Sequence, residues 1–182
     1  MSPSPGHSLP RASHDLPRED LDTIRAMFSY MRPAGSPAEQ AFVDRFLTPL
    51  GFKRDPFNNL WLQIGEAPTI LWSSHVDTVH YMSGTQAVHL SPDNHLRLTK
   101  KAKAVSSNCL GADCTAGVWL MTEMVKAGIE GLYVIHHGEE KGCIGSRALA
   151  RWEEAPMFFR GINAAIAFDR MGYGDVVTHQ MG

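Results

Sequence analysis

The stretch LYVIHHGEEKG at residues 132–142 decides the fold class, because it joins a short apolar run to a pair of acidic residues. The run over residues 132–136 is typical of a β-strand that is covered on both faces. Glu139 and Glu140 follow shortly after it, where α/β sheets gather ligand-binding residues. Two desolvated carboxylates repel each other, and a divalent cation on one of them would remove that repulsion. A solvated acidic turn, which Lys141 would favour, is the alternative.

Two further apolar runs are followed by residues of the same chemical kind. Residues 69–73 precede His75, and residues 162–168 precede Asp169. Helical periodicity separates these runs, so strands and helices alternate along the chain. This alternation predicts an α/β fold, a three-layer sandwich around a central, largely parallel (mixed) sheet. The ends of its strands would bring ligand-type residues to one edge of the sheet.

The remaining elements follow from capping and turn signals. Ser36 is suited to cap a helix that has Pro37 at its first position. The expected helices cover residues 20–31, 37–47, 117–127 and 144–152. A further strand is expected at 60–64, a hairpin at 87–90 and 95–99, and a polar loop at 100–108.

The composition narrows the class of protein. A formal net charge of -2 over 182 residues gives no electrostatic basis for binding nucleic acid or an anionic membrane. No apolar run approaches the roughly 18 residues that a membrane span needs. Three cysteines are too few for a disulfide framework, which favours a reducing, cytoplasmic location. Residues 1–18, rich in Pro and Ser, predict a disordered tail that lacks the apolar region of a signal peptide.

His75 and Asp77 lie two residues apart, after the strand predicted at residues 69–73. In an extended chain, side chains at this spacing share one side. Asp77 could then accept a hydrogen bond from His75 and fix its tautomer, while the other ring nitrogen binds a metal ion. The alternative is a structural histidine beside an aspartate that caps a helix.

Asp113 and Asp169 also have two interpretations each. Asp113 stands among small residues that let the backbone pack closely around a carboxylate, or it caps a helix that starts near Thr115. Asp169 could be a metal ligand or could pair with Arg170. Histidine with several carboxylates is the ligand set of a catalytic divalent-metal site.

Other histidines and the cysteines carry weaker signals. His80 and His137 are close enough in sequence to the motifs to contact a substrate or a ligand, whereas the remaining histidines are expected to be structural or exposed. Cys114 and Cys143 border the motifs. Neither has a histidine partner in the context of a nucleophile, so cysteine-based catalysis is not favoured.

Four motifs occur in a specific order: SHVDTV at residues 74–79, LGADCTAG at 110–117, GEEKGCIGS at 138–146 and FDR at 168–170. Together they resemble the motifs of the co-catalytic zinc metallopeptidases of the M20/M28 type, which include aminopeptidases, carboxypeptidases, dipeptidases and related amidohydrolases. The resemblance extends from about residue 21 to the end of the chain.

The resemblance implies a set of metal ligands. His75 and Asp169 would bind one metal ion, Asp113 would bridge two ions, and Glu140 would bind the second. The cofactor would be Zn²⁺, one or two ions per chain, or another divalent ion such as Co²⁺ or Mn²⁺. The substrate would be a peptide or an N-acyl amino acid.

The resemblance also implies two catalytic roles. Glu139 would act as the general base, taking a proton from the attacking water and later passing it to the leaving amine. Asp77 would orient His75. The implied reaction is the hydrolysis of a peptide or amide bond by an aminopeptidase-like or dipeptidase-like enzyme.

The chain departs from the family pattern at two places. Cys114 stands where many relatives carry Asp or Asn, and the last metal ligand of the family, a histidine far downstream of Asp169, has no counterpart before Gly182. His179 is too close to Asp169 to match it. Residues 19–182 are therefore expected to form a partial catalytic domain. The alternative function is a non-catalytic remnant that binds a metal ion or a completing partner, with a tendency to self-associate.

Overall fold

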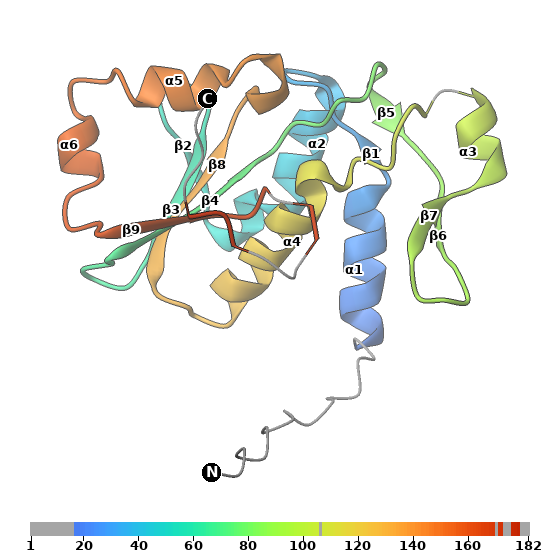
Figure 1. Ribbon diagram of the computed structural model, residues 1–182, viewed down its shortest axis with the longest axis horizontal. Helices are drawn as coiled ribbons and strands as arrows, with labels where there is room; N and C mark the ends of the chain where they lie inside the picture. The colour runs from blue at the N-terminus through green and yellow to red at the C-terminus, as the bar shows by residue number, and fades with distance from the viewer. Residues whose placement is uncertain (1–16, 106, 170, 173–175, 179–182) are drawn as a thin grey trace, which may run out of the picture.

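The computed structural model describes residues 17–105, 107–169, 171–172 and 176–178. Most of the predicted N-terminal tail lies outside these residues. The first helix, α1, spans Arg18–Phe28. Figure 1 shows the sheet between α6 on one side and α1 on the other. None of the helices in the described part of the chain is both long and apolar enough to cross a membrane.

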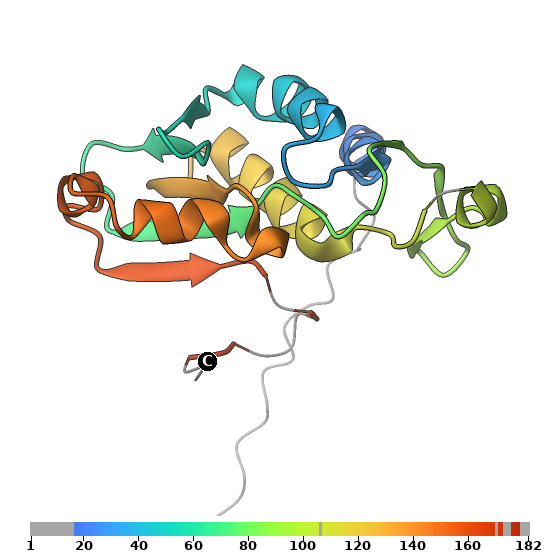
Figure 2. The same cartoon turned by 90° about the horizontal axis from the view of Figure 1, so that it is seen from above.

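The central sheet has five strands in the order β2-β3-β8-β4-β9. Their bounds are β2 Lys53–Arg54, β3 Leu60–Ile64, β8 Gly131–His136, β4 Ile70–His75 and β9 Ala164–Ala167. β4 pairs in parallel with β8 and with β9, whereas β3 runs antiparallel to β8 and β2 antiparallel to β3. The predicted mixed α/β fold is confirmed. Figure 2 shows β9, in orange-red, at one edge of the sheet.

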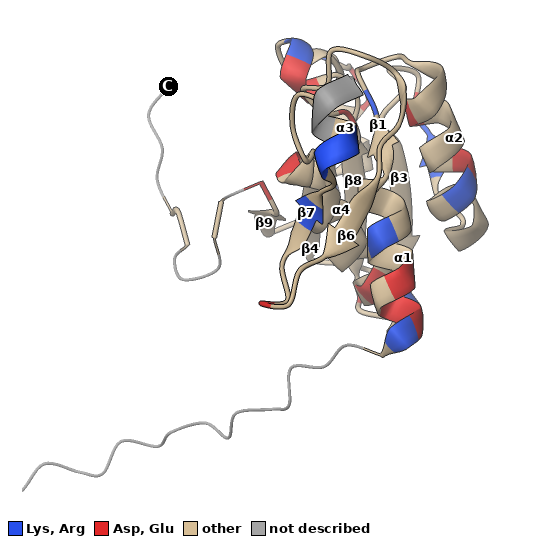
Figure 3. Cartoon of the chain, turned by 90° about the vertical axis from the view of Figure 1, so that its right-hand side faces the viewer, with Lys and Arg blue, Asp and Glu red and all other residues tan. Residues whose placement is uncertain are grey.

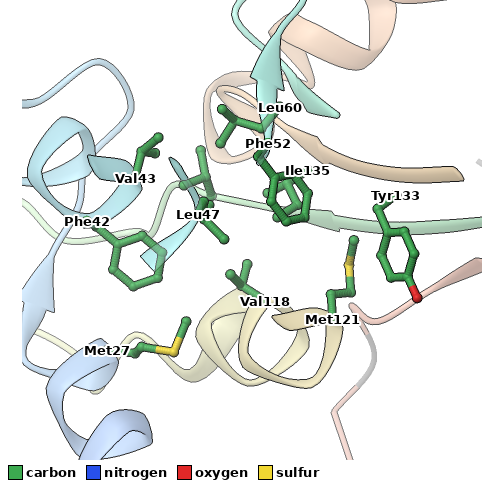
Figure 4. Close-up of a cluster of buried hydrophobic side chains, with 11 residues drawn as sticks. Met27, Phe42, Val43, Leu47, Phe52, Leu60, Val118, Met121, Tyr133 and Ile135 are labelled. Atoms are coloured by element: carbon green, nitrogen blue, oxygen red, sulfur yellow. The ribbon is translucent and has the colours of Figure 1, made fainter. Parts of the chain in front are cut away.

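Side chains alternate between the two faces of β8 and build a core on each. Tyr133 and Ile135 belong to the larger cluster, together with residues of α1, of α2 (Pro37–Phe46) and of α4 (Ala112–Lys126). Figure 4 shows this cluster, with Met27, Phe42, Val118 and Met121 among the labelled side chains. Helices on this face therefore form one outer layer.

The opposite face of β8 carries Leu132 and Val134. They pack with Leu149 of α5 (Ile144–Leu149) and with partly buried aromatic residues around α6 (Ala155–Phe158). These helices form the second outer layer. The continuous apolar run of β8 is thus explained, because both of its faces are covered.

Smaller elements lie beside the main sheet. β1 (Tyr30–Met31) pairs with β5 (Gly84–Thr85), and β6 (Val88–Leu90) pairs with β7 (Leu96–Leu98) as the predicted hairpin. Two short 3₁₀ turns span Thr48–Leu50 and Glu139–Lys141. On α1 and α2, acidic and basic residues are interspersed, so these helices present no face of a single charge (Figure 3).

Four details of the predicted elements were wrong. α4 begins at Ala112 rather than at residue 117, and α5 ends at Leu149 rather than at residue 152. The other two have a clear physical cause. The region predicted as a polar loop contains α3 (Lys100–Val105), because Thr99 accepts a hydrogen bond from the backbone N–H of Ala102 and its lysines and alanines favour a helix. The helix predicted to reach residue 31 ends at Phe28, because Tyr30 and Met31 pair with β5 instead. Tertiary pairing has here overridden the local helical pattern.

Ile135 of β8 and Ile166 of β9 predict contrasting stability effects. Ile135 is fully buried, whereas Ile166 on the edge strand is 43% exposed. Ile135→Ala should lower the free energy of unfolding by about 2–5 kcal/mol, through lost burial and a residual cavity. Ile166→Ala is the matched control and should cost less than about 1 kcal/mol. Urea denaturation measures both, and equal losses would contradict the assignment of β9 as an exposed edge.

Candidate metal centre

His75 is the last residue of β4 and its side chain is only 2% exposed. It lies beside His136 of β8 in the parallel register. Because β9 is also parallel to β4, three strands end at the same edge of the sheet. The segment that follows each strand therefore starts close to His75.

Two carboxylates from distant parts of the chain reach the imidazole of His75. Its Nε2 atom lies 3.0 Å from Oδ1 of Asp113, in the first turn of α4, and 3.2 Å from Oδ1 of Asp169, just after β9. The side chains of Asp113 and Asp169 are 66% and 43% exposed. The contact favours a shared site over the alternative of Asp113 as a helix cap. Arg170, the alternative partner of Asp169, lies outside the described residues.

The other ring nitrogen of His75 faces Asp77. Nδ1 lies 3.0 Å from the backbone oxygen of Asp77 and 3.6 Å from its carboxylate Oδ1. A proton on Nδ1 can be donated to that backbone oxygen, which leaves Nε2 to face the two carboxylates. The sequence pattern predicts the carboxylate of Asp77 in this position, but the backbone oxygen of the same residue lies closer to Nδ1.

The carboxylate of Asp77 instead holds the glutamate pair. It is fully buried and accepts hydrogen bonds from the backbone N–H groups of Glu139, at 3.0 Å, and Glu140, at 3.1 Å. Burial opposes ionisation, but the nearby imidazole of His75 and the hydrogen bonds from these N–H groups outweigh it and lower the pKa of Asp77. One ionised side chain thus ties the first motif to the third. Nothing in the sequence pattern signalled this contact.

The two glutamates stand beside the imidazole on a 3₁₀ turn. Donor atoms of His75, Glu139 and Glu140 all lie within 4.8 Å of one another. Burial and the charge of Asp113 raise the pKa of Glu140. Oε1 of Glu139 lies 3.5 Å from the Sγ atom of Cys143, whose backbone has a φ of 57°. A non-glycine residue seldom adopts this left-handed conformation, which recurs at functional sites.

The electrostatics of the cluster favour a cation. Burial alone would lower the pKa of His75, but the carboxylates of Asp77, Asp113 and Asp169 outweigh it and raise the pKa to about 9. Burial and the contact with Asp113 raise the pKa of Asp169 to about 6, against the charge of His75. Crowded carboxylates therefore hold a positive charge on the imidazole, and a bound metal ion would provide it instead.

The donor set fits a divalent metal ion. Imidazole nitrogen and carboxylate oxygen are donors that Zn²⁺ and similar ions use. Two donors at about 2.1 Å from one tetrahedral zinc ion lie roughly 3.4 Å apart. The distances of 3.0 and 3.2 Å from His75 Nε2 to the two aspartates are close to that value.

Cys114 contacts the chain on either side of the site through two hydrogen bonds. Its buried Sγ atom lies 2.6 Å from Oγ of Ser74 and donates to the backbone oxygen of Phe168, also at 2.6 Å. Burial raises the pKa of its thiol to about 11. Although Sγ falls within the same 4.8 Å group as His75, Asp113 and Asp169, these contacts make it a neutral donor that fixes the residue before Asp169.

Asn59 supports the glutamate turn in a similar way. This fully buried side chain accepts from the backbone N–H of His137 at 3.1 Å and donates to the backbone oxygen of Gly145 at 3.1 Å. A Cβ atom on Gly145 would lie 2.0 Å from Oδ1 of Asn59, so this position requires glycine.

The histidines near the motifs have different surroundings. His80 is buried and hydrogen-bonded to Thr78, Gln86 and the backbone of Cys109, which makes it structural. His137 pairs with Glu39 at 3.1 Å. His179 lies outside the described residues.

Comparison with known proteins gives the fold a context. No family model matches the chain, and no curated protein matches its sequence. Similar solved structures include a tripeptidase from Staphylococcus aureus subsp. aureus Mu50, with 22% identity and a TM-score of 0.61 over 84% of this chain and 43% of that one. Aminopeptidase PepT from Bacillus cereus ATCC 10987 has 21% identity and a TM-score of 0.60, over 84% and 43% of the two chains.

Human carnosine dipeptidase 1 has 14% identity and a TM-score of 0.60, over 85% of this chain and 39% of its own. At these identities the likeness concerns the fold. The chain thus spans about two fifths of the length of these peptidases, and it has the fold of the corresponding part of each.

Proposed function

We propose that the chain carries the metal site of a hydrolase that cleaves a peptide or amide bond, with aminopeptidase-like or dipeptidase-like chemistry. The observation that carries this proposal is the convergence of His75 with Asp113 and Asp169 beside a pair of glutamates. Residues 19–182 would then be part of a catalytic domain. The likeness of the fold to that of peptidases supports the same reaction class.

The roles of the ligands follow from donor type and position. His75 and Asp169 would hold one divalent ion, Zn²⁺ or alternatively Co²⁺ or Mn²⁺. Asp113 would bridge to a second position that Glu140 lines. When bound, such an ion supplies Lewis acidity, which polarises a carbonyl group and lowers the pKa of water towards about 7.

Glu139 is the proposed general base. Its backbone N–H is held by Asp77, which fixes the turn on which the carboxylate stands. From that position Glu139 would accept a proton from the attacking water and later deliver it to the leaving amine. Asp77 would position His75 through its backbone oxygen and the glutamate turn through its carboxylate. The substrate is proposed to be a peptide or an N-acyl amino acid.

A single metal ion is the expected stoichiometry of this chain. Among the described residues, both groups of donor atoms that could hold a metal ion share the imidazole of His75. Nδ1 of this ring faces the backbone oxygen of Asp77, so Nε2 is the nitrogen left for a metal ion, and one nitrogen cannot serve two ions. A second position built from carboxylates and water alone is a weak zinc site. A metal-binding chain without turnover is the second candidate function, and the shared imidazole is the observation that favours it.

Metal binding is the first test of the proposed function. The wild-type chain should bind about one Zn²⁺ per chain, and zinc at 100-fold over its dissociation constant should raise the free energy of unfolding by about 2.7 kcal/mol. His75→Ala should abolish both effects, because it removes the only imidazole of the site in the described residues. The control is His89→Ala, which changes an exposed histidine of the β6–β7 hairpin.

Elemental analysis after dialysis, together with urea denaturation with and without zinc, measures the two quantities. Equal zinc content in His75→Ala and His89→Ala would show that zinc binds elsewhere on the chain. Two tightly bound ions per wild-type chain would contradict the expected stoichiometry.

The two glutamates predict a separation of turnover from metal content. Glu139→Gln should reduce turnover by about 10²–10⁴, because the general base is lost, and should leave the zinc content largely intact. Glu140→Gln, its neighbour, should weaken metal binding when a second equivalent is offered. A panel of aminoacyl and acyl-amino-acid substrates measures turnover. Near-normal turnover in Glu139→Gln would assign the base to another residue, and no turnover in the zinc-loaded wild type would favour the second candidate function.

A further inference from the structure

Arg32 is the largest fully buried side chain of the molecule's described part. It follows β1 and has no exposed surface. Its Nε atom donates to the backbone oxygen of Val76 at 2.9 Å, and Nη2 donates to Oγ1 of Thr115 at 2.9 Å. Nη1 donates to the backbone oxygen of Met27, at the end of α1, at 3.3 Å. One guanidinium therefore connects α1, the segment after β4 and the beginning of α4.

The backbone of Arg32 contacts the same segment. Its oxygen accepts from the N–H of Thr78 at 2.9 Å, and its N–H donates to Oγ1 of Thr78 at 3.1 Å. Val76 and Thr78 are the two neighbours of Asp77. Both sides of Asp77 are thus held by one residue, and His75 immediately precedes this segment.

Thr115 carries the connection to the second motif. Its hydroxyl accepts from Arg32 and donates to the backbone oxygen of Gly111. Gly111 and Thr115 flank Asp113 by two residues on each side. The chain from Arg32 through Thr115 therefore braces the turn that presents the carboxylate of Asp113 to His75.

Burial of this charge needs a specific reason. Among the residues that the structure describes, no carboxylate lies within ion-pair distance of the guanidinium of Arg32. Burial lowers the pKa of Arg32 to about 10, against the favourable charges of Glu39 and Asp77. The ring of Phe42, 3.9 Å from Cζ, gives partial compensation. A buried charge without a direct partner is costly, and an apolar side chain would fill the space at lower cost.

We propose that Arg32 is a positioning residue that sets the distance between His75 and Asp113. The planar fork of an arginine has donors in fixed directions, which lets one side chain hold three acceptors at once. Two of these acceptors, on Val76 and Thr115, belong to the segments that carry His75 and Asp113, whose side chains lie 3.0 Å apart. This inference rests on the proposed function, because it assumes that these two residues bind a metal ion together.

The affinity for Zn²⁺, measured by competition with a chromophoric chelator, tests whether the guanidinium of Arg32 positions the two ligands. Arg32→Lys keeps a positive charge but cannot hold three acceptors, and it should weaken zinc binding about tenfold, the lower end of what supporting contacts contribute. Thr115→Val removes one acceptor at nearly constant volume and should weaken binding in the same direction. If the charge alone mattered, Arg32→Lys would bind zinc as tightly as the wild type, and the inference would be overturned.

Leu149→Ala is the control for loss of stability alone. Leu149 of α5 is buried in the cluster on the opposite face of the sheet, with Leu132 and Val134 of β8. This variant should lower the melting temperature at least as much as Thr115→Val, with a zinc affinity within about twofold of the wild type. A loss of affinity in Leu149→Ala that matches its loss of stability would mean that any destabilisation weakens the site, which overturns the specific role of Arg32.

The double variant Arg32→Lys/Thr115→Val tests whether the two residues act through one connection. Its zinc affinity should be no lower than that of the single variant with the lower affinity, because both changes break the same connection. If the fold-losses in zinc affinity of the two single variants multiply in the double variant, their effects are independent, which would contradict the inference. If Arg32→Lys does not fold, Thr115→Val against Leu149→Ala decides alone. A wild-type chain that does not bind zinc would remove the proposed function and this inference together, whereas zinc binding that both variants retain would remove only the inference.

Discussion

The parallel pairing of β4 with β8 on one side and β9 on the other is the constraint on which the rest of the site depends. Parallel strands end at the same edge of a sheet, so residues far apart in the chain leave it together. His75 ends β4, the glutamate turn follows β8, and Asp169 follows β9. Asp113 lies in the first turn of α4, which packs on the same sheet. Without this pairing, the ligand-type residues would have no common location.

Sequence patterns predicted this arrangement at the level of strands. The apolar runs before His75, Glu139 and Asp169 predict the strands, because a run of apolar residues is a strong signal in composition. Burial on both faces explains the run of β8, whereas the four residues of β9 are exposed. The side-chain contacts within the site have no comparable signal in the sequence. Asp77 holds the backbone of Glu139 and Glu140, which depends on how two loops meet in space. Likewise, α3 arose where charge and polarity had suggested a loop, because capping by Thr99 outweighed them.

Cys114 shows why a departure from a family pattern is hard to interpret from sequence. The position looks like a disturbed acidic neighbour of Asp113, yet the buried thiol accepts a hydrogen bond from the hydroxyl of Ser74 and donates one to the backbone oxygen of Phe168. A neutral donor here secures the chain before Asp169 without adding a further negative charge. Carboxylates already crowd His75, and their repulsion grows with each added charge in a desolvated site. A thiol at this position is therefore compatible with the same arrangement of ligands.

The two halves of the site differ in how exposed their side chains are. His75 and Asp77 are almost fully buried and fixed by hydrogen bonds to the backbone, so their positions are set by folding. The side chains of Asp113 and Asp169 are largely exposed, and Asp169 follows an edge strand whose four residues are all exposed. Exposed carboxylates gain little from contacts in water, whereas a shared cation binds both directly. Under the proposed function, a bound ion would join the exposed half of the site to the buried half and would add to the pairing that attaches β9 to the sheet.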